Sequence, residues 1–503
     1  MIFYGLGCFG TTNPVHKEVI VASKDLRQFI KDLDKTGDIV HIKQSVDWDL
    51  EVGAIGRHAY ETEGPAVLFE KIKDYPDGFR IFGGLTGTFR RVAIALGLDP
   101  EIPVKELYKE YERRINNPIK PVIVDTGPCK ENIIVGDDVD LYSLPVPYIH
   151  EGDGGRYIGT WAFEVTKDPD TKWSNWGMYR FMIHNKRHIV GWPRYSSHFS
   201  MMLHGKYVAQ KKAMPMALVI GADPLCDLVA TAPIAINADE ADYAGGLALE
   251  PVELVKCETS DLLVPANAEI VIEGEVYPDR TAEEGPFGEY PGYRMEGSKN
   301  GVLCRIKAIT HRNSPIFTMI SLGIPPDDSS IAASMTAALA MKRRLIRHEI
   351  PITEVYVPPY GVTHIAVIGV KPGAGGNAIA KQIRDVLTSR RADCNKFIVV
   401  DSDVDPFDFN QVIHAFATKC HPMRGIFVEE IEAPRGNALT PAYNAEERRA
   451  YRGAIALFDC TWPPELNVIN EVPVKNSFDM MFPEELKKKV LANWKAFGFK
   501  ENK

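Results

Sequence analysis

The sequence predicts a multidomain fold of the mixed α+β and α/β classes, with a small N-terminal α/β unit, a central antiparallel sheet or barrel, and a C-terminal α/β unit. Its 503 residues exceed what one hydrophobic core usually supports. Apolar residues make up 45% and charged residues 25%, which is ordinary globular usage. The pattern of helical and extended stretches also changes twice along the chain. We therefore predict units at 1–125, 126–315 and 316–480, followed by a C-terminal helix at 481–503.

The N-terminal unit is predicted from alternating helical and extended patterns. A helix is expected at 24–35, with Ser23 as its N-cap and Asp25 beside the positive end of its dipole. The apolar residues that share one face of this helix are Leu26, Phe29, Ile30 and Leu33. The next elements are expected as a strand at 39–42, a helix at 50–60 and a strand near 66–69. The unit ends near Pro118–Pro121.

The central unit is predicted to be a largely antiparallel sheet or barrel. Short alternating or β-branched runs recur there, separated by clusters of Gly, Pro and Asp. We expect its strands at 158–165, 188–190, 217–220, 269–272 and 301–310. One helix, at 199–213, interrupts them.

The C-terminal unit follows a βαβ rhythm, which predicts a parallel sheet. Its expected helices lie at 330–347, 378–390 and 409–418, and its expected strands at 354–357, 364–368 and 396–400. A last helix, at 483–497, carries mixed charge, and we expect it to dock elsewhere on the protein or on a partner subunit.

Charge and cysteine usage narrow the class of protein. The net charge of −9 and the pI near 5.9 argue against a nucleic-acid or anionic-membrane partner. No apolar run reaches the ~20 residues that span a bilayer. The eight cysteines include no C-x-x-C pair, which is typical of reduced thiols in a cytosol-like compartment. The first 22 residues, to which we assign no role, lack the features of a signal or mitochondrial import peptide, so we expect a cytoplasmic protein.

Several local motifs carry little functional weight. The glycine-rich stretch 371–382 could bind phosphate at the start of a helix, but it matches neither G-x-x-x-x-G-K-[ST] nor G-x-G-x-x-G. An ordinary βα connection is the simpler interpretation. His311 and His364 have no neighbour at metal-ligand spacing, so a structural role is favoured for each. The sequence has no G-x-S-x-G motif to indicate an α/β-hydrolase.

The stretch 279–290, DRTAEEGPFGEY, gathers candidate proton-transfer groups. Glu284 and Glu289 stand on either side of a Gly-Pro-Phe-Gly turn, which can bring both toward one pocket. Two carboxylates held close together cannot both ionise at low cost, so one of them can keep a proton to donate. Composition alone favours an acidic, solvated loop, but the apolar Pro286 and Phe287 between the acids argue against a fully solvated tip.

The stretch 173–180, WSNWGMYR, places Asn175 and Arg180 among large aromatic side chains. An arginine there can clamp a carboxylate or phosphate where water is restricted, although a core strand with one snorkelling arginine explains the pattern equally well. Asn175, His198 and Glu258 could supply oxygen, nitrogen and oxygen ligands to a hard divalent ion that also holds phosphate. Their separations are too long for a local metal motif, so spacing alone does not show such a site.

Together these stretches resemble the UbiD-like decarboxylases, which use prenylated FMN. The likeness to ferulic and phenylacrylic acid decarboxylases extends from about Leu26 to Gly498. The stretches that carry it are DLEVGAIGRHAYE (49–61), LPVPYIHEGDGGRYIGTW (144–161), KWSNWGMYR (172–180), PVELVKCETSDLLVPANAEIVIEGE (251–275) and EGPFGEYPGY (284–293). So many ordered matches are a far more specific signal than a single glycine motif.

The resemblance implies a central split β-barrel that binds the flavin, followed by an oligomerising α/β domain, in a homodimer or higher homo-oligomer supplied with cofactor by a flavin prenyltransferase. It implies that Asn175, His198 and Glu258 bind Mn²⁺ or Mg²⁺, which bridges to the cofactor phosphate. A K⁺ site would use mostly backbone oxygens around Trp176 and Ala230–Ala232. The residues that would contact the cofactor, some of them through the metal ion, are Asn175, Trp176, Gly177, Met178, Tyr179, Arg180, Ser197, His198 and Glu258.

The same resemblance implies that Arg180, Glu284 and Glu289 form the catalytic network, with Glu289 as the proton donor. A small aromatic, heteroaromatic or α,β-unsaturated carboxylic acid would form a covalent adduct with prenylated FMN, which acts as an electron sink. CO₂ would then leave, and Glu289 would donate a proton in its place. Arg180 would hold the substrate carboxylate and keep Glu284 ionised. The reaction would be a reversible, non-oxidative decarboxylation.

The sequence departs from this pattern where the substrate is expected to bind. The stretch 321–333, SLGIPPDDSSIAA, differs from the usual sequence of phenylacrylic acid enzymes. The stretch 434–463 is closer in sequence to hydroxybenzoate-type members such as protocatechuate decarboxylases. Ser197 stands where glutamine is common, which would leave more room beside the flavin. The candidates for polar partners of a phenolic substrate are Asp327, Asp328 and His364.

Two other functions stay open at this point. The chain could be a non-catalytic or assembly subunit of a multi-subunit aromatic carboxylase, but its intact set of one arginine and two glutamates counts against that. It could instead bind a nucleotide through the stretch 371–382, although the lysine and the Ser or Thr of a phosphate-binding loop are missing there.

Overall fold

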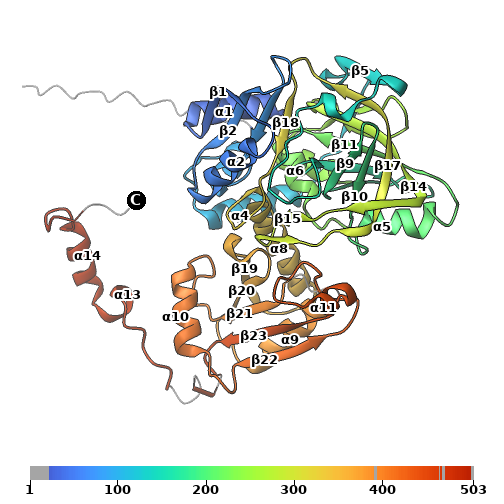
Figure 1. Ribbon diagram of the computed structural model, residues 1–503. Helices are drawn as coiled ribbons and strands as arrows, with labels where there is room; N and C mark the ends of the chain where they lie inside the picture. The colour runs from blue at the N-terminus through green and yellow to red at the C-terminus, as the bar shows by residue number, and fades with distance from the viewer. Residues whose placement is uncertain (1–21, 390–393, 464, 467–470, 500–503) are drawn as a thin grey trace, which may run out of the picture.

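The computed structural model describes residues 22–389, 394–463, 465–466 and 471–499. Within these ranges an N-terminal unit and a central unit lie side by side, with a C-terminal unit below them in the view of Figure 1. Helix α8 (Asp328–Arg347) runs between the central and C-terminal units. Residues 1–21, to which no role is assigned above, lie outside the described ranges.

The N-terminal unit is a four-stranded sheet of order β1-β2-β3-β18 with helices packed against it. Strand β18 enters from the end of the central segment and pairs in parallel with β3, so the two units share a sheet. The elements are α1 (Leu26–Thr36), β1 (Ile39–Val46), α2 (Glu51–Glu61), β2 (Ala66–Ile72), β3 (Arg80–Gly83), α3 (Phe89–Ala95), α4 (Val104–Ile115) and β18 (Ile316–Met319).

The first helix begins two residues later than predicted because Asp25, and not Ser23, is its N-cap. The Asp25 side chain accepts a hydrogen bond from the Gln28 amide at 2.7 Å. A carboxylate at this position also interacts favourably with the helix dipole, which a serine hydroxyl does less well.

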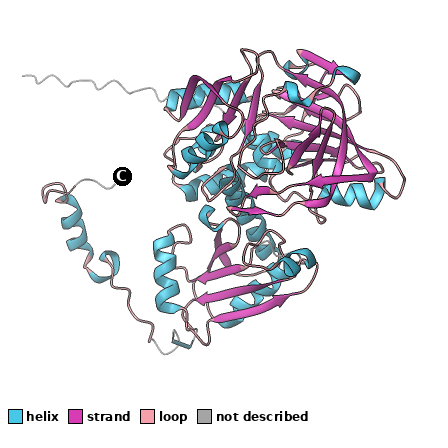
Figure 2. Ribbon diagram, viewed as in Figure 1, coloured by secondary structure: helices cyan, strands magenta, loops and turns pink. Residues whose placement is uncertain are grey.

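The central unit is built on a nine-stranded antiparallel sheet that curls into a half barrel (Figure 2). Its order is β6-β9-β10-β17-β14-β11-β7-β8, with β5 paired beside β17. Its strands are β5 (Asn132–Val135), β6 (Tyr157–Gly159), β7 (Phe163–Lys167), β8 (Ser174–Gly177), β9 (Phe181–Asn185), β10 (His188–Gly191), β11 (Met214–Ile220), β14 (Ile270–Glu284) and β17 (Ser298–His311). The smaller strands are β4 (Val122–Val124), β12 (Glu253–Lys256) and β13 (Leu263–Pro265) in one sheet, and β15 (Phe287–Glu289) and β16 (Tyr293–Met295) in a hairpin.

Three predictions for this unit are corrected. The strand predicted at 158–165 is two strands, because the chain leaves β6 at one end of the curled sheet and joins β7 near the other. The helix predicted at 199–213 is shorter, with α5 (His198–Met202) continued by one π-helical turn at Leu203–Tyr207. Helices α6 (Pro224–Ala230) and α7 (Glu240–Ala248) were not predicted, and α6 is buried on every side, so its sequence carries no amphipathic period.

The C-terminal unit contains a five-stranded sheet of order β19-β20-β21-β23-β22. The predicted parallel sheet is only partly correct. Strands β20, β21 and β23 are parallel neighbours, whereas the two edge strands pair antiparallel. The elements are β19 (Ile352–Tyr356), β20 (Ile365–Val370), α9 (Asn377–Thr388), β21 (Lys396–Val400), α10 (Phe409–Lys419), β22 (Ile426–Ile431), α11 (Ala445–Ala450) and β23 (Gly453–Cys460).

A C-terminal arm follows this sheet and carries two short helices, α13 (Phe478–Met481) and α14 (Glu484–Ala492). The helix predicted at 483–497 is therefore shorter than expected. No residue of 471–499 is buried, and the arm lies away from the body of the protein in Figure 1. None of the helices in the described ranges is long and apolar enough to cross a bilayer.

Candidate active site

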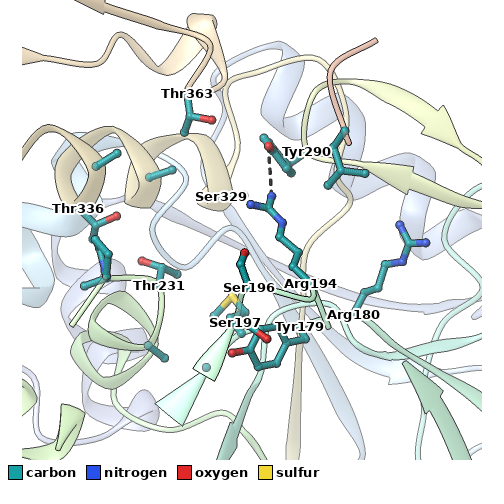
Figure 3. A pocket seen from close by; sticks show the side chains of 18 of the residues that line it. Tyr179, Arg180, Arg194, Ser196, Ser197, Thr231, Tyr290, Ser329, Thr336 and Thr363 are labelled. Carbon is teal, nitrogen blue, oxygen red and sulfur yellow. Dashed lines mark hydrogen bonds between the residues drawn. The ribbon is translucent and has the colours of Figure 1, made fainter. Parts of the chain in front are cut away.

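A cavity of about 540 Å³ opens between the central and C-terminal units (Figure 3). Its walls come from the open mouth of the half barrel, from the end of α6, from α8, and from the loop that precedes α11. This volume lies within the usual range for sites that bind cofactors and small molecules.

The stretch 175–180 lines this cavity because of its place in the sheet. Strand β8 stands at one end of the strand order and β9 near the other, so residues 178–180 cross between the two ends of the half barrel. Every residue from Asn175 to Arg180 lies on the cavity wall, as predicted for cofactor contacts, and so do Ser197 and His198. Ser197 also caps α5, where its side chain accepts a hydrogen bond from the Ser200 amide.

Arg180 brings the two predicted glutamates together. Its Nε and Nη2 donate to the two carboxylate oxygens of Glu284 at 2.9 and 2.8 Å, and its Nη1 donates to Glu289. The Arg180 side chain is only 7% exposed, and its guanidinium lies over the rings of Trp192 and Phe287. Burial by itself lowers the pKa of Arg180, but the two carboxylates more than offset that effect and raise the pKa.

The two glutamates differ in what surrounds them. Glu284 is fully buried, does not line the cavity, and accepts a further hydrogen bond from the Tyr157 hydroxyl at 2.6 Å. These three donor atoms fix the Glu284 carboxylate in place. Glu289 lines the cavity, and among the described residues its donors besides Arg180 are limited to the Tyr290 amide, at a longer 3.3 Å. Of the two acids, Glu289 is thus the one that faces the cavity.

The solvated acidic loop that composition favoured at 279–290 is not what the structure contains. Phe287 is 2% exposed and packs on the Tyr157 ring, with centroids 4.1 Å apart. Gly285 adopts φ 88°, where a side chain would be strained, and this conformation turns the chain from β14 into the β15–β16 hairpin. The apolar turn therefore anchors both acids in the protein interior.

Asn175 and His198 meet at the cavity wall, where His198 Nδ1 lies 2.9 Å from Asn175 Oδ1. Burial lowers the pKa of His198, which favours the neutral imidazole that binds metals. The Asn175 amide nitrogen is buried without a partner among the described residues. Such an unsatisfied polar group beside a cavity is consistent with a site that a ligand completes.

The predicted third metal ligand, Glu258, is placed elsewhere. It does not line the cavity, and its carboxylate pairs with Lys130. Glu240, which the sequence analysis missed, lies on the cavity wall instead and accepts a hydrogen bond from the Trp176 amide at 2.8 Å. Burial raises the pKa of Glu240 to about 8, although this hydrogen bond opposes the shift. In the described ranges no lysine or arginine pairs with Glu240, so a bound cation would stabilise its ionised form.

The polar residues predicted to contact the substrate do not line the cavity. Asp327 is the N-cap of α8 and accepts from the Ser330 amide at 2.8 Å, and Asp328 is bonded to Tyr60 and Thr86. These contacts explain both acids as structural groups at the helix start. His364 is buried behind Tyr290, whose ring it stacks on at a centroid distance of 6.5 Å. The polar side chains that do line this part of the cavity, and that were missed, include Arg194, Tyr290, Thr363 and Asn437.

The glycine-rich turn at 371–382 is an ordinary connection between β20 and α9. The Gly376 amide at the helix start donates to the Thr461 hydroxyl at 2.6 Å, and the turn lies outside the cavity. The nucleotide-binding alternative therefore gains no support from the structure.

Comparison with known proteins follows the same three-part division. Family models described as the N-terminal, Rift-related and C-terminal domains of 3-octaprenyl-4-hydroxybenzoate carboxy-lyase match residues 30–111, 120–325 and 330–460. The chain is 31% identical to a pyrrole-2-carboxylic acid decarboxylase of Pseudomonas aeruginosa, with 94% of this chain and 98% of the relative covered. It is also 31% identical to ferulic acid decarboxylase 1 of Saccharomyces cerevisiae, with 95% and 98% covered.

Solved structures of decarboxylases and other UbiD-class enzymes are similar to this chain over almost its whole length. The closed form of the vanillic acid decarboxylase of Sedimentibacter hydroxybenzoicus superposes with a TM-score of 0.83 at 29% identity, over 95% of this chain and all of that one. A UbiD-class enzyme of Pelotomaculum thermopropionicum, solved in complex with FMN, gives a TM-score of 0.79 at 28% identity, over 93% of this chain and all of that one. An evolved dimeric form of the latter, in complex with prenylated FMN, gives 0.76 at 27% identity, over 94% of this chain and all of that one.

Proposed function

Since this chain belongs to the UbiD family of carboxy-lyases, we propose that it removes CO₂ reversibly and without oxidation from an aromatic, heteroaromatic or α,β-unsaturated carboxylic acid, with prenylated FMN as its cofactor. The observation that carries this proposal is the buried Arg180 held between Glu284 and Glu289 at the wall of one large cavity. A structural or assembly subunit would have no need to keep these three charges together in the interior.

The residues at the cavity fit the proposed cofactor and ions. The volume of about 540 Å³ accommodates a flavin ring system together with a small acid. Asn175, His198 and Glu240 would hold Mn²⁺ or Mg²⁺, a donor set of oxygens and one imidazole that also suits a phosphate-bridging ion. Backbone oxygens around Trp176 and Ala230–Ala232, which line the same wall, would hold K⁺. When bound, the flavin would supply an electron sink for the electron pair that the departing CO₂ leaves on the substrate carbon.

The protein's own contribution is to hold and move one proton. The bond between the substrate carbon and its carboxyl group breaks, the electron pair stays with the carbon, and the protonated Glu289 donates its proton to that carbon. The Glu289 carboxylate left behind is stabilised by Arg180 Nη1 and the Tyr290 amide. Arg180 keeps its orientation because its Nε and Nη2 donate to the buried Glu284 carboxylate. In the reverse direction the same carboxylate takes the proton back.

The proposal is tested on protein co-expressed with a flavin prenyltransferase, which would supply the cofactor. We expect a visible absorption band that differs from that of FMN, bound manganese or magnesium, and CO₂ release from at least one acid in a panel of cinnamic, hydroxybenzoic and heteroaromatic acids. Colourless, metal-free protein that releases CO₂ from none of them would contradict the proposal and would favour an assembly role.

We further propose that the protein acts in the cytoplasm as a homodimer or higher homo-oligomer. The described cysteines are all free, and all except Cys420 are buried, as expected in a reducing compartment. The arm at 471–499 exposes several large apolar side chains, and helix α10 exposes an apolar stripe at Phe409, Ile413 and Phe416. Two such unpartnered surfaces on one chain support packing of the arm of one copy against α10 of another.

Charges introduced into the arm should therefore weaken this association. The double substitution Leu486→Glu and Leu491→Glu is expected to raise the dimer dissociation constant at least about 100-fold. Each leucine would contribute roughly 1.5–3 kcal/mol when it becomes buried at the interface between two copies. Sedimentation measured over a concentration series checks this, with Lys488→Gln in the same helix as the control. An unchanged dissociation constant in the double variant would refute the arm's role.

A further inference from the structure

Tyr290 follows the proton donor directly and faces the same cavity (Figure 3). Its hydroxyl oxygen accepts a hydrogen bond from Arg194 Nη2 at 3.2 Å and another from Asn437 Nδ2 at 3.0 Å. Arg194 comes from the central unit and Asn437 from the C-terminal unit, so the phenol is held from both sides of the cavity. All three of these side chains line the cavity wall.

In both of these hydrogen bonds the Tyr290 hydroxyl must be the acceptor. A guanidinium has no acceptor, so Arg194 can only donate. The Asn437 amide is oriented by its own oxygen, which accepts from the Leu439 backbone amide at 3.0 Å and leaves the nitrogen pointing at Tyr290. Asn437 is itself only 2% exposed, so the protein around it holds its amide in this orientation.

These contacts leave Tyr290 with one unused hydrogen-bonding function. A phenolic hydroxyl has two acceptor positions and one proton to donate, and both acceptor positions are taken. No acceptor for that proton is found among the described residues, and the hydroxyl lies at the cavity wall. The nearby positive charge of Arg194, whose guanidinium also lies 5.6 Å from the ring centroid, strengthens the phenol as a donor.

We propose that Tyr290 donates this hydrogen bond to an oxygen atom carried by the ring of the substrate. This inference rests on the proposed function and makes its substrate class narrower: an aromatic acid with a hydroxyl, methoxy or similar oxygen substituent. A plain hydrocarbon ring offers no acceptor and leaves the donor unsatisfied. A ring whose only polar atom is an N–H places one donor against another. A site with a committed donor discriminates strongly against analogues that lack its partner.

The test compares isosteric acids that differ only in hydroxyl against methyl, with the substituent placed meta or para to the carboxyl group. For the holoenzyme we expect kcat/KM for the better hydroxy acid to exceed that of its methyl counterpart by at least about tenfold. In Tyr290→Phe this ratio should fall to near one, through loss on the hydroxy acid alone. Tyr293→Phe, at an exposed tyrosine that does not line the cavity, is the matched control and should keep the ratio. The variant should also retain its visible flavin band, which reports that it folds and binds cofactor.

Calorimetric binding of the same acids separates this inference from the proposed function. If the hydroxy acid binds more tightly than its methyl counterpart and Tyr290→Phe abolishes the difference, the donor role is supported even when no acid releases CO₂. The absence of CO₂ release would then contradict the decarboxylase proposal alone. Turnover of hydroxy and methyl acids at equal efficiency would overturn the donor role and leave the decarboxylase standing. Loss of flavin from Tyr290→Phe would show that the phenol donates to the cofactor, which also overturns the inference.

Discussion

Replacing Glu289 with glutamine is expected to lower CO₂ release by about 10³-fold or more while flavin and metal stay bound. General acid catalysis commonly contributes 10²–10⁴-fold, and in our mechanism Glu289 is the group that protonates the carbon that loses CO₂. The amide has the size of the carboxyl group, and its oxygen can still accept from Arg180 Nη1. The substitution therefore removes the transferable proton with little change in packing.

Two neighbouring acids serve as controls for this result. Glu283 is exposed, and Glu283→Gln should leave turnover unchanged although it stands in the same stretch of sequence. Glu284→Gln removes the buried charge that orients Arg180, so it should lower both turnover and stability, since breaking a buried ion pair typically costs 3–5 kcal/mol. The visible spectrum and single-turnover CO₂ release are measured for each. Full activity of the Glu289 variant would remove Glu289 from its role as proton donor.

The meeting of Arg180 with Glu284 and Glu289, which the resemblance to the UbiD-like decarboxylases implied, is the part of the predicted site that the structure reproduces most closely. Glu284 and Glu289 flank a short apolar turn, and a buried Phe287 between two acids is hard to reconcile with a solvated loop. What the sequence could not show is which acid is fixed and which faces the ligand. That distinction depends on Tyr157, which reaches Glu284 from β6, more than a hundred residues earlier in the chain.

The fold was predicted where the hydrophobic period is strong and missed where burial is complete. Strand β21 has a continuous apolar pattern and lies where it was expected, and helix α1 has a clear one-sided pattern and begins only two residues later than expected. Helix α6 is apolar on all sides, which resembles a loop or a buried strand when only the sequence is considered. The antiparallel pairing of the two edge strands of the C-terminal sheet could not be predicted, because the direction of pairing depends on which strands become neighbours in the folded protein.

Two errors at the site have chemical explanations. Asp327 is followed three residues later by Ser330, a spacing typical of a helix cap, and this signal should have indicated a structural role. Glu240 lies in the acidic first turn of α7, beside Asp239 and Asp242. Acids in a first helical turn are ordinarily explained by the helix dipole, so no feature of the sequence distinguished Glu240 from its acidic neighbours.

The competing assignments of Glu240 and Glu258 make opposite predictions for metal and flavin content. Glu240→Gln should lose both, because it replaces a carboxylate on the cavity wall by a neutral amide next to Asn175 and His198. Substitutions around bound metals that do not even touch the ion cost 10–100-fold in affinity, so removal of a direct ligand should cost at least about 100-fold. His198→Ala should have the same effect, since it removes the one nitrogen donor of the set.

Glu258→Gln is the matched control, because it makes the same chemical change at the other candidate. The Glu258 carboxylate is 29% exposed and pairs with Lys130, and loss of such a partly exposed pair costs only about 0–1 kcal/mol. We expect this variant to be purified with normal metal and flavin, measured by elemental analysis and by visible absorbance. Metal retained by Glu240→Gln but lost by Glu258→Gln would restore the original assignment. It would also require the turn between β12 and β13 to swing its acid onto the cavity wall, a rearrangement that the Glu258 amide, bonded to Glu273 at 2.8 Å, opposes.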